Sequence, residues 1–407
     1  MTERSDYPVL SVEEARERIL SFCHPLAPAS RPILDALDLV LAEDVAADRD
    51  TPPADNSAMD GYAVYAADLD PAGGTRLPVV MDIAAGHPPA RPLQRGEAAR
   101  IMTGALMPEG PDTVVQFEHT EGDGRMVTVR RSPSPGRNVR RRGEDVRAGE
   151  VVLRRGKRLR PQEIGMLASV GRSEVLVQPP PLVGLLATGD EVVPLGEAPE
   201  PGQIRDINTY TNAAQVRRAG GKPLLAGVAH DDAGEIGKCL RAALDAGASL
   251  IVTSGGVSVG DFDLVKQVLS AQGEMGFWLV NMKPGKPLAF GTVAGVPLIG
   301  LPGNPVSAMI AFELFARPAV HRLRGLPVSA PRTIPARLSA AIERKDGRRH
   351  YLRVQLRQDD GLTYADLTGD QGSGILTSLV EADGLAIVPE DIHRLPAGAE
   401  VQVVLLE

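Results

Sequence analysis

The chain has 407 residues, which is long for one hydrophobic core, so the length predicts roughly two to four domains. Hydrophobic residues make up 43% and charged residues 24%, which excludes a disordered chain, and the formal net charge of −8 speaks against a broad nucleic-acid-binding surface. Its two cysteines, Cys23 and Cys239, support neither a zinc site nor a disulfide framework. No signal peptide and no run of about 18 apolar residues occurs. We expect a cytoplasmic protein without a membrane segment.

The first part of the chain has a helical pattern on each side of a β pattern. Ser11 and Glu14 match a capping box before apolar residues at helical spacing, and Pro161 and Gly171 bracket a second helix. Between these helices, short Val and Ile runs alternate with Pro and Gly turns. We expect the two helices to share a layer. Residues 46–145 then form a mainly β domain inserted into a discontinuous domain of residues 1–45 and 146–180.

The second part of the chain changes texture twice. Across residues 181–328, apolar strands alternate with amphipathic helices, which predicts right-handed βαβ units on a mostly parallel sheet. From residue 329 to 407, short alternating strands and turns return, which predicts a compact C-terminal β domain. The fold class is therefore α/β and multidomain.

Acidic and Gly-rich turns follow three predicted strands of the α/β region. Glu191 follows the first strand, Asp231 the second, and the stretch from Ser254 to Asp263 the third. For any one turn, helix N-capping is the ordinary explanation. Three such turns at the carboxyl edge of one parallel sheet favour a ligand crevice. The Gly-rich loop offers backbone N–H groups to phosphate, although it matches neither a P-loop nor a dinucleotide fingerprint.

Two further turns of the same region are stiffened by proline. In "MKPGKPLAFG", Pro284 forbids a helix between Lys283 and Lys286, which directly precede another apolar strand. A solvated basic turn is the ordinary alternative. In "IGLPGNPVSAM", Asn304 is suited to N-cap a helix that starts at Pro305. Lysines and backbone donors suit an anion and clustered carboxylates suit Mg²⁺, so the pattern predicts a Mg²⁺-dependent enzyme acting on a phosphate-containing ligand.

Motifs spread in order over nearly the whole chain resemble one family. They are similar to those of the molybdopterin molybdenumtransferases, the MoeA family, which is related to the C-terminal E domain of gephyrin. The matching stretches are "DNSAMDGYA" (55–63), "RIMTGALMPEGPDTVV" (100–115), "RRRGEDV" (140–146), "TGDEVV" (188–193), "SGGVSVGDFDLVK" (254–266), "KPGKPLAFG" (283–291), "LPGNPVSA" (301–308) and "DQGSG" (370–374).

The resemblance implies a fold, a reaction and partners. It implies an L-shaped homodimer of four-domain subunits, with a doubly wound α/β domain like the stand-alone molybdopterin adenylyltransferases and a small C-terminal β-barrel. The implied reaction inserts molybdate into adenylylated molybdopterin and releases AMP in the presence of Mg²⁺, giving molybdenum cofactor. A molybdopterin adenylyltransferase and downstream molybdoenzyme maturation proteins are implied partners, without nucleic acid or membrane.

Site residues follow from the same resemblance, position by position. Asp60 and Thr103 are expected to reach the crevice of the other subunit, and Asp145 is a further functional acid. Glu191, Asp231 and Asp263 are expected to handle metal and phosphate. The implied contacts to molybdate or the pterin ligand are Ser254, Gly255, Gly256, Ser258, Lys283, Lys286, Pro287, Pro302 and Pro305, together with Arg353 and Ser373 from the C-terminal domain.

Two alternatives remain at this stage. One is molybdopterin adenylylation, the preceding step, performed by a similar α/β domain. The other is a non-catalytic scaffold, since the related region of gephyrin also anchors a receptor. The additional β domains argue against the first, and the intact acids and lysines argue against the second.

Overall fold

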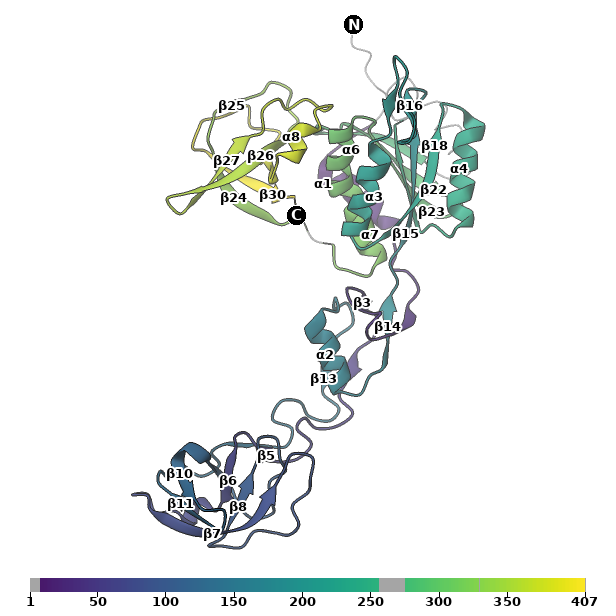
Figure 1. Cartoon of the computed structure of the whole chain (residues 1–407). Coiled ribbons are helices and arrows are strands. Elements are labelled where there is room, and N and C mark those ends of the chain that lie inside the picture. The colour runs from purple at the N-terminus through teal and green to yellow at the C-terminus, as the bar shows by residue number, and fades with distance from the viewer. Residues whose placement is uncertain (1–7, 256–274, 329, 407) are drawn as a thin grey trace.

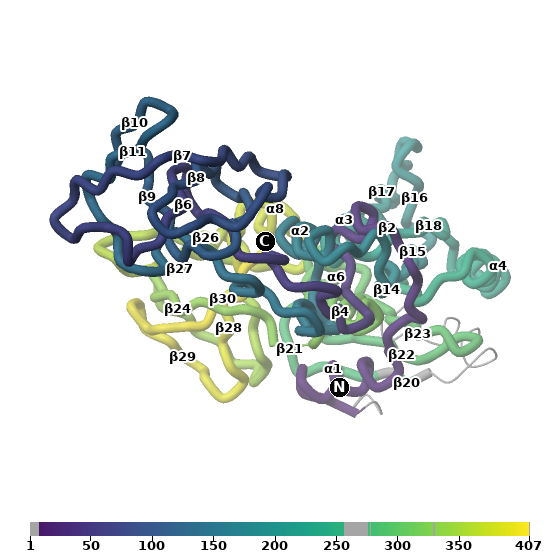
Figure 2. The backbone as a smooth tube through the Cα atoms, turned by 90° about the horizontal axis from the view of Figure 1, so that it is seen from below, coloured from purple at the N-terminus to yellow at the C-terminus, as the bar shows by residue number. Residues whose placement is uncertain are grey.

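The computed structural model describes residues 8–255, 275–328 and 330–406. The chain is elongated (Figure 1): a small β unit forms one end, and an α/β unit lies beside a β-barrel at the other. A narrow unit around helix α2 (Pro161–Ser169) joins the two ends. Figure 2, viewed from below, also places the barrel beside the α/β unit, with helix α4 (Ala233–Asp245) on the side away from the barrel.

A seven-stranded mixed sheet forms the centre of the α/β unit. Its strands, in order across the sheet, are β1 (Val9–Leu10), β20 (Met275–Val280), β22 (Pro287–Val293), β23 (Val296–Leu301), β19 (Leu250–Ser254), β15 (Leu182–Thr188) and β18 (Lys222–Ala229). The last four run parallel, whereas β22 is antiparallel to both neighbours. β15 is apolar almost throughout because helices cover both faces of the sheet.

Helices pack on both faces of this sheet. α4 covers one face through Ile236 and Leu240, which lie one helical turn apart. The helices of the opposite face share a separate core and are α1 (Val12–Ser21), α3 (Asn208–Arg218), α6 (Pro305–Ala311), the π-helical η3 (Phe312–Ala316) and α7 (Arg317–Leu323). This arrangement confirms the predicted doubly wound α/β fold.

The position of α1 corrects one expectation. Ser11 and Glu14 form the predicted capping box at its start. The helix does not share a layer with α2, however, because its buried side chains belong to the core of the α/β unit and β1 pairs in parallel with β20. Helical periodicity shows that a helix has an apolar face, but it does not show which partner covers that face.

The narrow unit has its own small core, made from two separate segments of the chain. Leu167 of α2 is fully buried there with Leu41 and Val177. The strands that surround this core are β2 (Ala29–Pro32), β3 (Val40–Leu41), β4 (Val45–Ala46), β13 (Val151–Leu153) and β14 (Glu174–Gln178). We propose residues 29–46 and 151–178 as the discontinuous domain, with α1 outside it.

The β unit at the far end lies between the two halves of the narrow unit in sequence. Gly61 begins a strand that leaves no room for a side chain, because a Cβ there would collide with the carbonyl oxygen of Val115. The sheet consists, in order, of β10 (Thr120–Gly122), β11 (Met126–Val129), β7 (Thr75–Ile83), β8 (Ala98–Ile101), β6 (Gly61–Val64) and β9 (Thr113–Gln116), and the neighbouring short elements are β5 (Asn56–Ser57), η1 (Ala66–Asp68), η2 (Phe117–His119) and β12 (Val139–Arg140).

The C-terminal strands close into a barrel, as predicted. The barrel strands are β24 (Thr333–Leu338), β26 (Arg349–Asp359), β27 (Leu362–Leu367), β28 (Gly384–Val388) and β30 (Glu400–Leu405), with α8 (Thr377–Val380), β25 (Ile342–Glu343) and β29 (Arg394–Leu395) beside them. The closure results from β26, which pairs with both β27 and β28, while β24 and β30 complete the ring. No helix within the described residues is long and apolar enough to cross a membrane.

Helix α7 contains a histidine that resists protonation. Burial, followed by the charges of Arg317, Arg324 and Arg158, lowers the pKa of His321 to about 4. The unfolded chain binds this proton near pH 6.5, so the unfolded state holds more protons between about pH 6.5 and pH 4, and stability falls as the pH drops through that window.

We therefore expect His321→Gln to reduce the loss of stability on acidification. Between about pH 7 and pH 5 the wild-type protein should lose roughly 1 to 2 kcal/mol more than this variant. Thermal unfolding followed at both pH values measures the difference, with the exposed His24→Gln as control. Equal pH dependence in wild type and His321→Gln would contradict the account.

Candidate active site

The lysine-bearing turn links the sheet to the barrel. The short strand β21 (Met282–Lys283) pairs in parallel with β26, so that Lys283 lies opposite His350. On the other side of the turn, β22 enters the sheet at Pro287. The backbone between them is buried and turns through Gly285, whose φ of +99° suits glycine. Because both ends are tied down, the turn presents Lys283 and Lys286 as exposed side chains on a fixed support.

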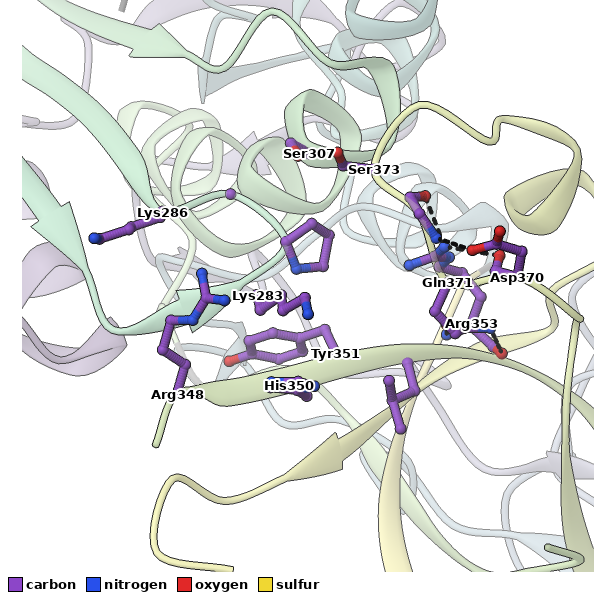
Figure 3. Close-up of a pocket in the computed structure, with 14 residues that line it drawn as sticks. Lys283, Lys286, Ser307, Arg348, His350, Tyr351, Arg353, Asp370, Gln371 and Ser373 are labelled. Carbon is purple, nitrogen blue, oxygen red and sulfur yellow. Dashed lines mark hydrogen bonds between the residues drawn. The ribbon is translucent and has the colours of Figure 1, made fainter. Parts of the chain in front are cut away.

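The two lysines line a pocket of about 490 Å³ at the junction of the α/β unit and the barrel (Figure 3). Ser307 from α6 and Ser373 from a barrel loop lie close together at one side of it, and Tyr351 of β26 lies beneath the lysine turn. The full lining comprises Lys283, Pro284, Gly285, Lys286, Ser307, Arg348, His350, Tyr351, Leu352, Arg353, Asp370, Gln371, Gly372 and Ser373. The fold thus brings together four predicted site residues from distant segments, namely Lys283, Lys286, Arg353 and Ser373.

Arg353 is the most buried charged side chain of the pocket, with an exposed fraction of only 1%. Its Nη2 donates to the carbonyl oxygens of Asp370 and Gly372 at 3.3 and 2.9 Å, and its Nε donates to Ser378 Oγ at 3.0 Å. These bonds hold the loop that carries Ser373. Among the described residues, no partner is found for Nη1 of Arg353, so its N–H groups remain for a ligand.

A carboxylate beneath the lysine turn organises the basic side chains. Asp346 Oδ1 lies 2.8 Å from His350 Nε2, and its Oδ2 lies 2.6 Å from Arg348 Nη2 and 3.8 Å from Lys283 Nζ. Partial burial opposes ionisation of Asp346, but the hydrogen bonds from His350 and Arg348 prevail and hold its pKa well below the usual range. Burial lowers the pKa of His350 despite this carboxylate, so the imidazole favours its neutral form. Asp346 therefore stays ionised at neutral pH.

The turn after β23 forms another wall of the site. Its sequence predicts the observed geometry: Asn304 occupies the N-cap of α6 and Pro305 its first position, although the Asn304 side chain makes no capping hydrogen bond. The N–H of Val306 donates to the carbonyl oxygen of Ser373 at 3.2 Å, which ties α6 to the barrel loop. Gly303 of this turn lies against Gly255. The N–H of Gly255 donates to the carbonyl oxygen of Leu301 at 3.2 Å.

The acidic turns do lie at one edge of the sheet. Because β15, β18, β19 and β23 are parallel, their carboxyl ends place Glu191, Asp231, Ser254 and Pro302 along the same side. The N–H of Asp231 donates to Asp190 Oδ1 at 3.0 Å, which joins the first two turns. Within the described ranges, no three His, Cys, Asp or Glu side chains are grouped to hold a metal ion. Gly256, Ser258 and Asp263 lie outside the described residues.

Three predicted residues lie far from this pocket within one chain. Asp60 and Thr103 belong to the β unit at the opposite end (Figure 1). Asp60 Oδ1 accepts hydrogen bonds from the N–H and Oγ of Thr103 at 2.7 and 2.8 Å, and chiefly the backbone bond lowers the pKa of Asp60. Asp145 is exposed and lies in sequence between the β unit and the second segment of the narrow unit. Its N–H donates to the carbonyl oxygen of Thr51. A single chain does not bring these acids to the lysines.

The lining residues that were not predicted include Ser307, Arg348 and His350. Asp346, which contacts Arg348, His350 and Lys283 but does not itself line the pocket, was not predicted either. Ser307 stands inside the quoted stretch "LPGNPVSA", so its position directly after the proline turn was a usable signal. The other three come from the Arg-rich segment between β25 and β26 and from the start of β26. Only the pairing of β21 with β26 places them at the lysine turn.

Fold and pocket together define a class of protein, in which a doubly wound α/β domain and a small β-barrel share a pocket lined by basic side chains. Family models match nearly the whole chain: the MoeA N-terminal region (domain I and II) over residues 10–171, a probable molybdopterin binding domain over 184–322, and the MoeA C-terminal region (domain IV) over 335–406. The chain belongs to the MoeA family.

Individual relatives and solved structures agree with this membership. Molybdopterin molybdenumtransferase 2 of Mycobacterium tuberculosis is 39% identical over 403 residues, covering 97% of this chain and 98% of the relative. The molybdopterin molybdenumtransferase of Haemophilus influenzae is 34% identical, with the same coverage. A crystal structure of a molybdopterin biosynthesis MoeA protein from Pyrococcus horikoshii is similar at a TM-score of 0.83 and 33% identity, covering 98% of this chain and 99% of that one.

Proposed function

We propose that this chain is a molybdopterin molybdenumtransferase, which inserts molybdate into adenylylated molybdopterin and releases AMP. The observation that carries the proposal is the pocket in which Lys283, Lys286, Arg353 and Ser373 converge. Molybdate is a tetrahedral dianion, and ammonium, guanidinium and hydroxyl donors on fixed supports are suited to hold its oxygens. Relatives that carry this activity in their names align over nearly the full length.

The residues of the pocket divide the work of binding and orientation. Lys283 and Lys286 offer compact charges from the rigid turn, while Arg353 fixes the Ser373 loop and keeps Nη1 for the ligand. Asp346 positions Lys283. Its negative charge does not repel a bound anion strongly, because Arg348 and His350 donate hydrogen bonds to its two oxygens. The pocket can therefore accept a dianion although a carboxylate lies nearby.

We also propose that Glu191, Asp231 and Asp263 handle Mg²⁺ together with the phosphates of the adenylylated ligand. In proteins, Mg²⁺ is usually bound by one or two carboxylates plus substrate phosphates and water, so a preformed three-acid cluster is not required. The exposed acids at the carboxyl ends of β15 and β18 fit this mode. When bound, Mg²⁺ would neutralise charge on the phosphate oxygens.

A homodimer completes the proposed site. Asp60, Thr103 and Asp145 lie far from the lysines in one chain, and an elongated chain can deliver its far end to the crevice of a second copy. We propose this cross-subunit arrangement for all three residues. A molybdopterin adenylyltransferase as donor of the substrate and molybdoenzyme maturation proteins as acceptors of the product are the proposed partners.

The experiment that tests the function is a molybdate-dependent release of AMP. Purified protein is incubated with adenylylated molybdopterin, Mg²⁺ and increasing molybdate, and AMP is quantified. We expect release that saturates with molybdate and stops when molybdate is omitted. Release of pyrophosphate from ATP and molybdopterin would instead identify an adenylyltransferase, and the absence of both reactions would favour a scaffold.

Asp346 gives a further prediction for the same assay. Without its charge, Lys283 and Arg348 lose a common anchor, so Asp346→Asn should raise the molybdate concentration for half-maximal rate about five- to tenfold while leaving the maximal rate within about twofold. Asp359→Asn, which removes an exposed carboxylate at the far end of β26, is the matched control. A lowered maximal rate with unchanged molybdate dependence would contradict a positioning role.

A further inference from the structure

A second cavity of about 620 Å³ also borders α6 and shares no lining residue with the lysine pocket. Met309 and Ile310 of α6 line it, whereas Ser307 of the same helix lines the lysine pocket. The remaining walls come from α3, from η3 and α7, from the start and end of the barrel segment, and from the narrow unit through Arg158. In Figure 1 these helices face the barrel, with the C-terminus near them.

The charges that line this cavity are strongly unbalanced. Arg158, Arg218, Arg317 and Arg332 line it together with a single carboxylate, Glu313. Glu313 Oε2 lies 2.7 Å from Arg317 Nε, so this acid is already paired. Within residues 8–255, 275–328 and 330–406, neither Arg218 nor Arg332 has an ion-pair partner. The cavity therefore holds at least two guanidinium groups without a counter-charge.

Further positive charges surround the cavity. Arg158 reaches it from the narrow unit, and its one ion pair within the described part of the chain is with the exposed Asp38, at 2.8 Å. His321 also lines the cavity, and after burial it is the neighbouring arginines that disfavour its protonation. The arginine charges that oppose protonation of His321 would attract an anion, whereas burial, the larger cause of the lowered pKa, favours neither sign of charge.

Apart from Gln215, which donates a hydrogen bond to Glu313, the rest of the lining is apolar. Ile310 is 1% exposed, and Leu379 of α8 is 8% exposed. Pro327 and Leu405 contribute further nonpolar surface. The volume lies in the range of sites for small organic ligands, which combine apolar walls with a few charged anchors. A bare inorganic anion would use the arginines but leave these walls without a partner.

We propose that this cavity is a second ligand site, which binds a small organic phosphate of the size of a nucleoside monophosphate. Arg218 and Arg332 hold the phosphate, because a guanidinium offers paired donors that match phosphate oxygens. The organic part packs against Ile310, Leu379 and Pro327. The site is separate from the lysine pocket and does not depend on the function proposed for that pocket.

Two methionines allow the two sites to be observed separately. Met309 lines the second cavity, and Met282 carries its Cε close to Gly285 of the lysine turn. The full-length protein labelled with ¹³C at the methionine methyl groups is titrated with AMP, inorganic phosphate and adenosine at constant ionic strength. Met309→Leu and Met282→Leu assign the two resonances.

We expect AMP to shift the Met309 resonance in a saturable manner, inorganic phosphate to do so more weakly, and adenosine to have no effect. Arg218→Gln/Arg332→Gln should weaken the AMP effect on Met309 at least about tenfold. The double variant should leave the Met282 resonance at its wild-type position, which also shows that the variant is folded. Arg217→Gln removes the neighbouring arginine of α3, which does not line the cavity, and should behave as wild type.

Several results would overturn the proposal. The Met309 shift could follow the same titration curve as Met282, persist in the double arginine variant, or respond equally to adenosine. A fourth is structural: if light scattering shows that the double variant halves the particle mass of the protein, the arginines serve contact between copies of the chain rather than a small ligand.

Discussion

Lys286→Ala is expected to lower turnover at limiting molybdate about tenfold or more, equivalent to about 1.4 kcal/mol of lost transition-state stabilisation. The side chain is exposed on a turn whose backbone is buried and held on both sides, so its removal should not disturb folding. An ordinary surface lysine would contribute well under about 1 kcal/mol. The same loss is expected for Lys283→Ala, which also lacks the contact to Asp346.

Lys286→Arg is not expected to restore activity. A guanidinium is planar and longer than an ammonium, so from this fixed turn it would place its donors wrongly against a tetrahedral oxyanion. Molybdate titration at constant adenylylated pterin compares the variants, with Lys238→Ala on the exposed side of α4 as control. Superimposable curves for wild type and both alanine variants would refute the assignment of these lysines.

Asp60→Ala is expected to leave the protein folded and to reduce molybdate-dependent AMP release about a hundredfold or more. This is the loss that removal of a positioned catalytic carboxylate typically causes. Asp60 is exposed and belongs to no core, and it is kept ionised by the N–H and hydroxyl of Thr103. Circular dichroism and light scattering check the fold and the particle mass.

The control for Asp60 is Asp123→Ala in the same β unit. Asp123 is likewise exposed in a turn and accepts backbone hydrogen bonds from Arg125 and Met126. A structural role would make the two variants equally active, or would unfold the Asp60 variant. Either outcome would remove Asp60 from the site.

Local patterns were sufficient for much of the fold and part of the pocket. Alternating apolar strands and amphipathic helices predict the α/β sheet, and "KPGKP" predicts the rigid lysine turn because proline restricts the backbone whatever surrounds it. "LPGNPVSA" likewise predicts the start of α6 at Pro305. In each case the controlling interaction lies within a few residues in sequence.

Contacts between distant segments were not predictable in this way. The apolar face of α1 fits either the α/β sheet or the narrow unit, and only the structure shows the former. Asp346 supports Lys283 because β21 adds to the barrel at β26, a pairing with no local sequence signal. The arginines of the second cavity come from four separate stretches, so no motif unites them.

Mixing two strongly impaired variants tests the central claim most directly, namely that one crevice built from two chains carries out the transfer. Lys286→Ala and Asp60→Ala dimers are mixed in equal amounts, subunit exchange is verified with distinguishable tags, and AMP release is measured. Random exchange makes half of the dimers mixed, each with one intact site, so activity should return to about a quarter of wild type. Activity that stays at the mean of the two unmixed variants despite proven exchange would contradict the shared crevice.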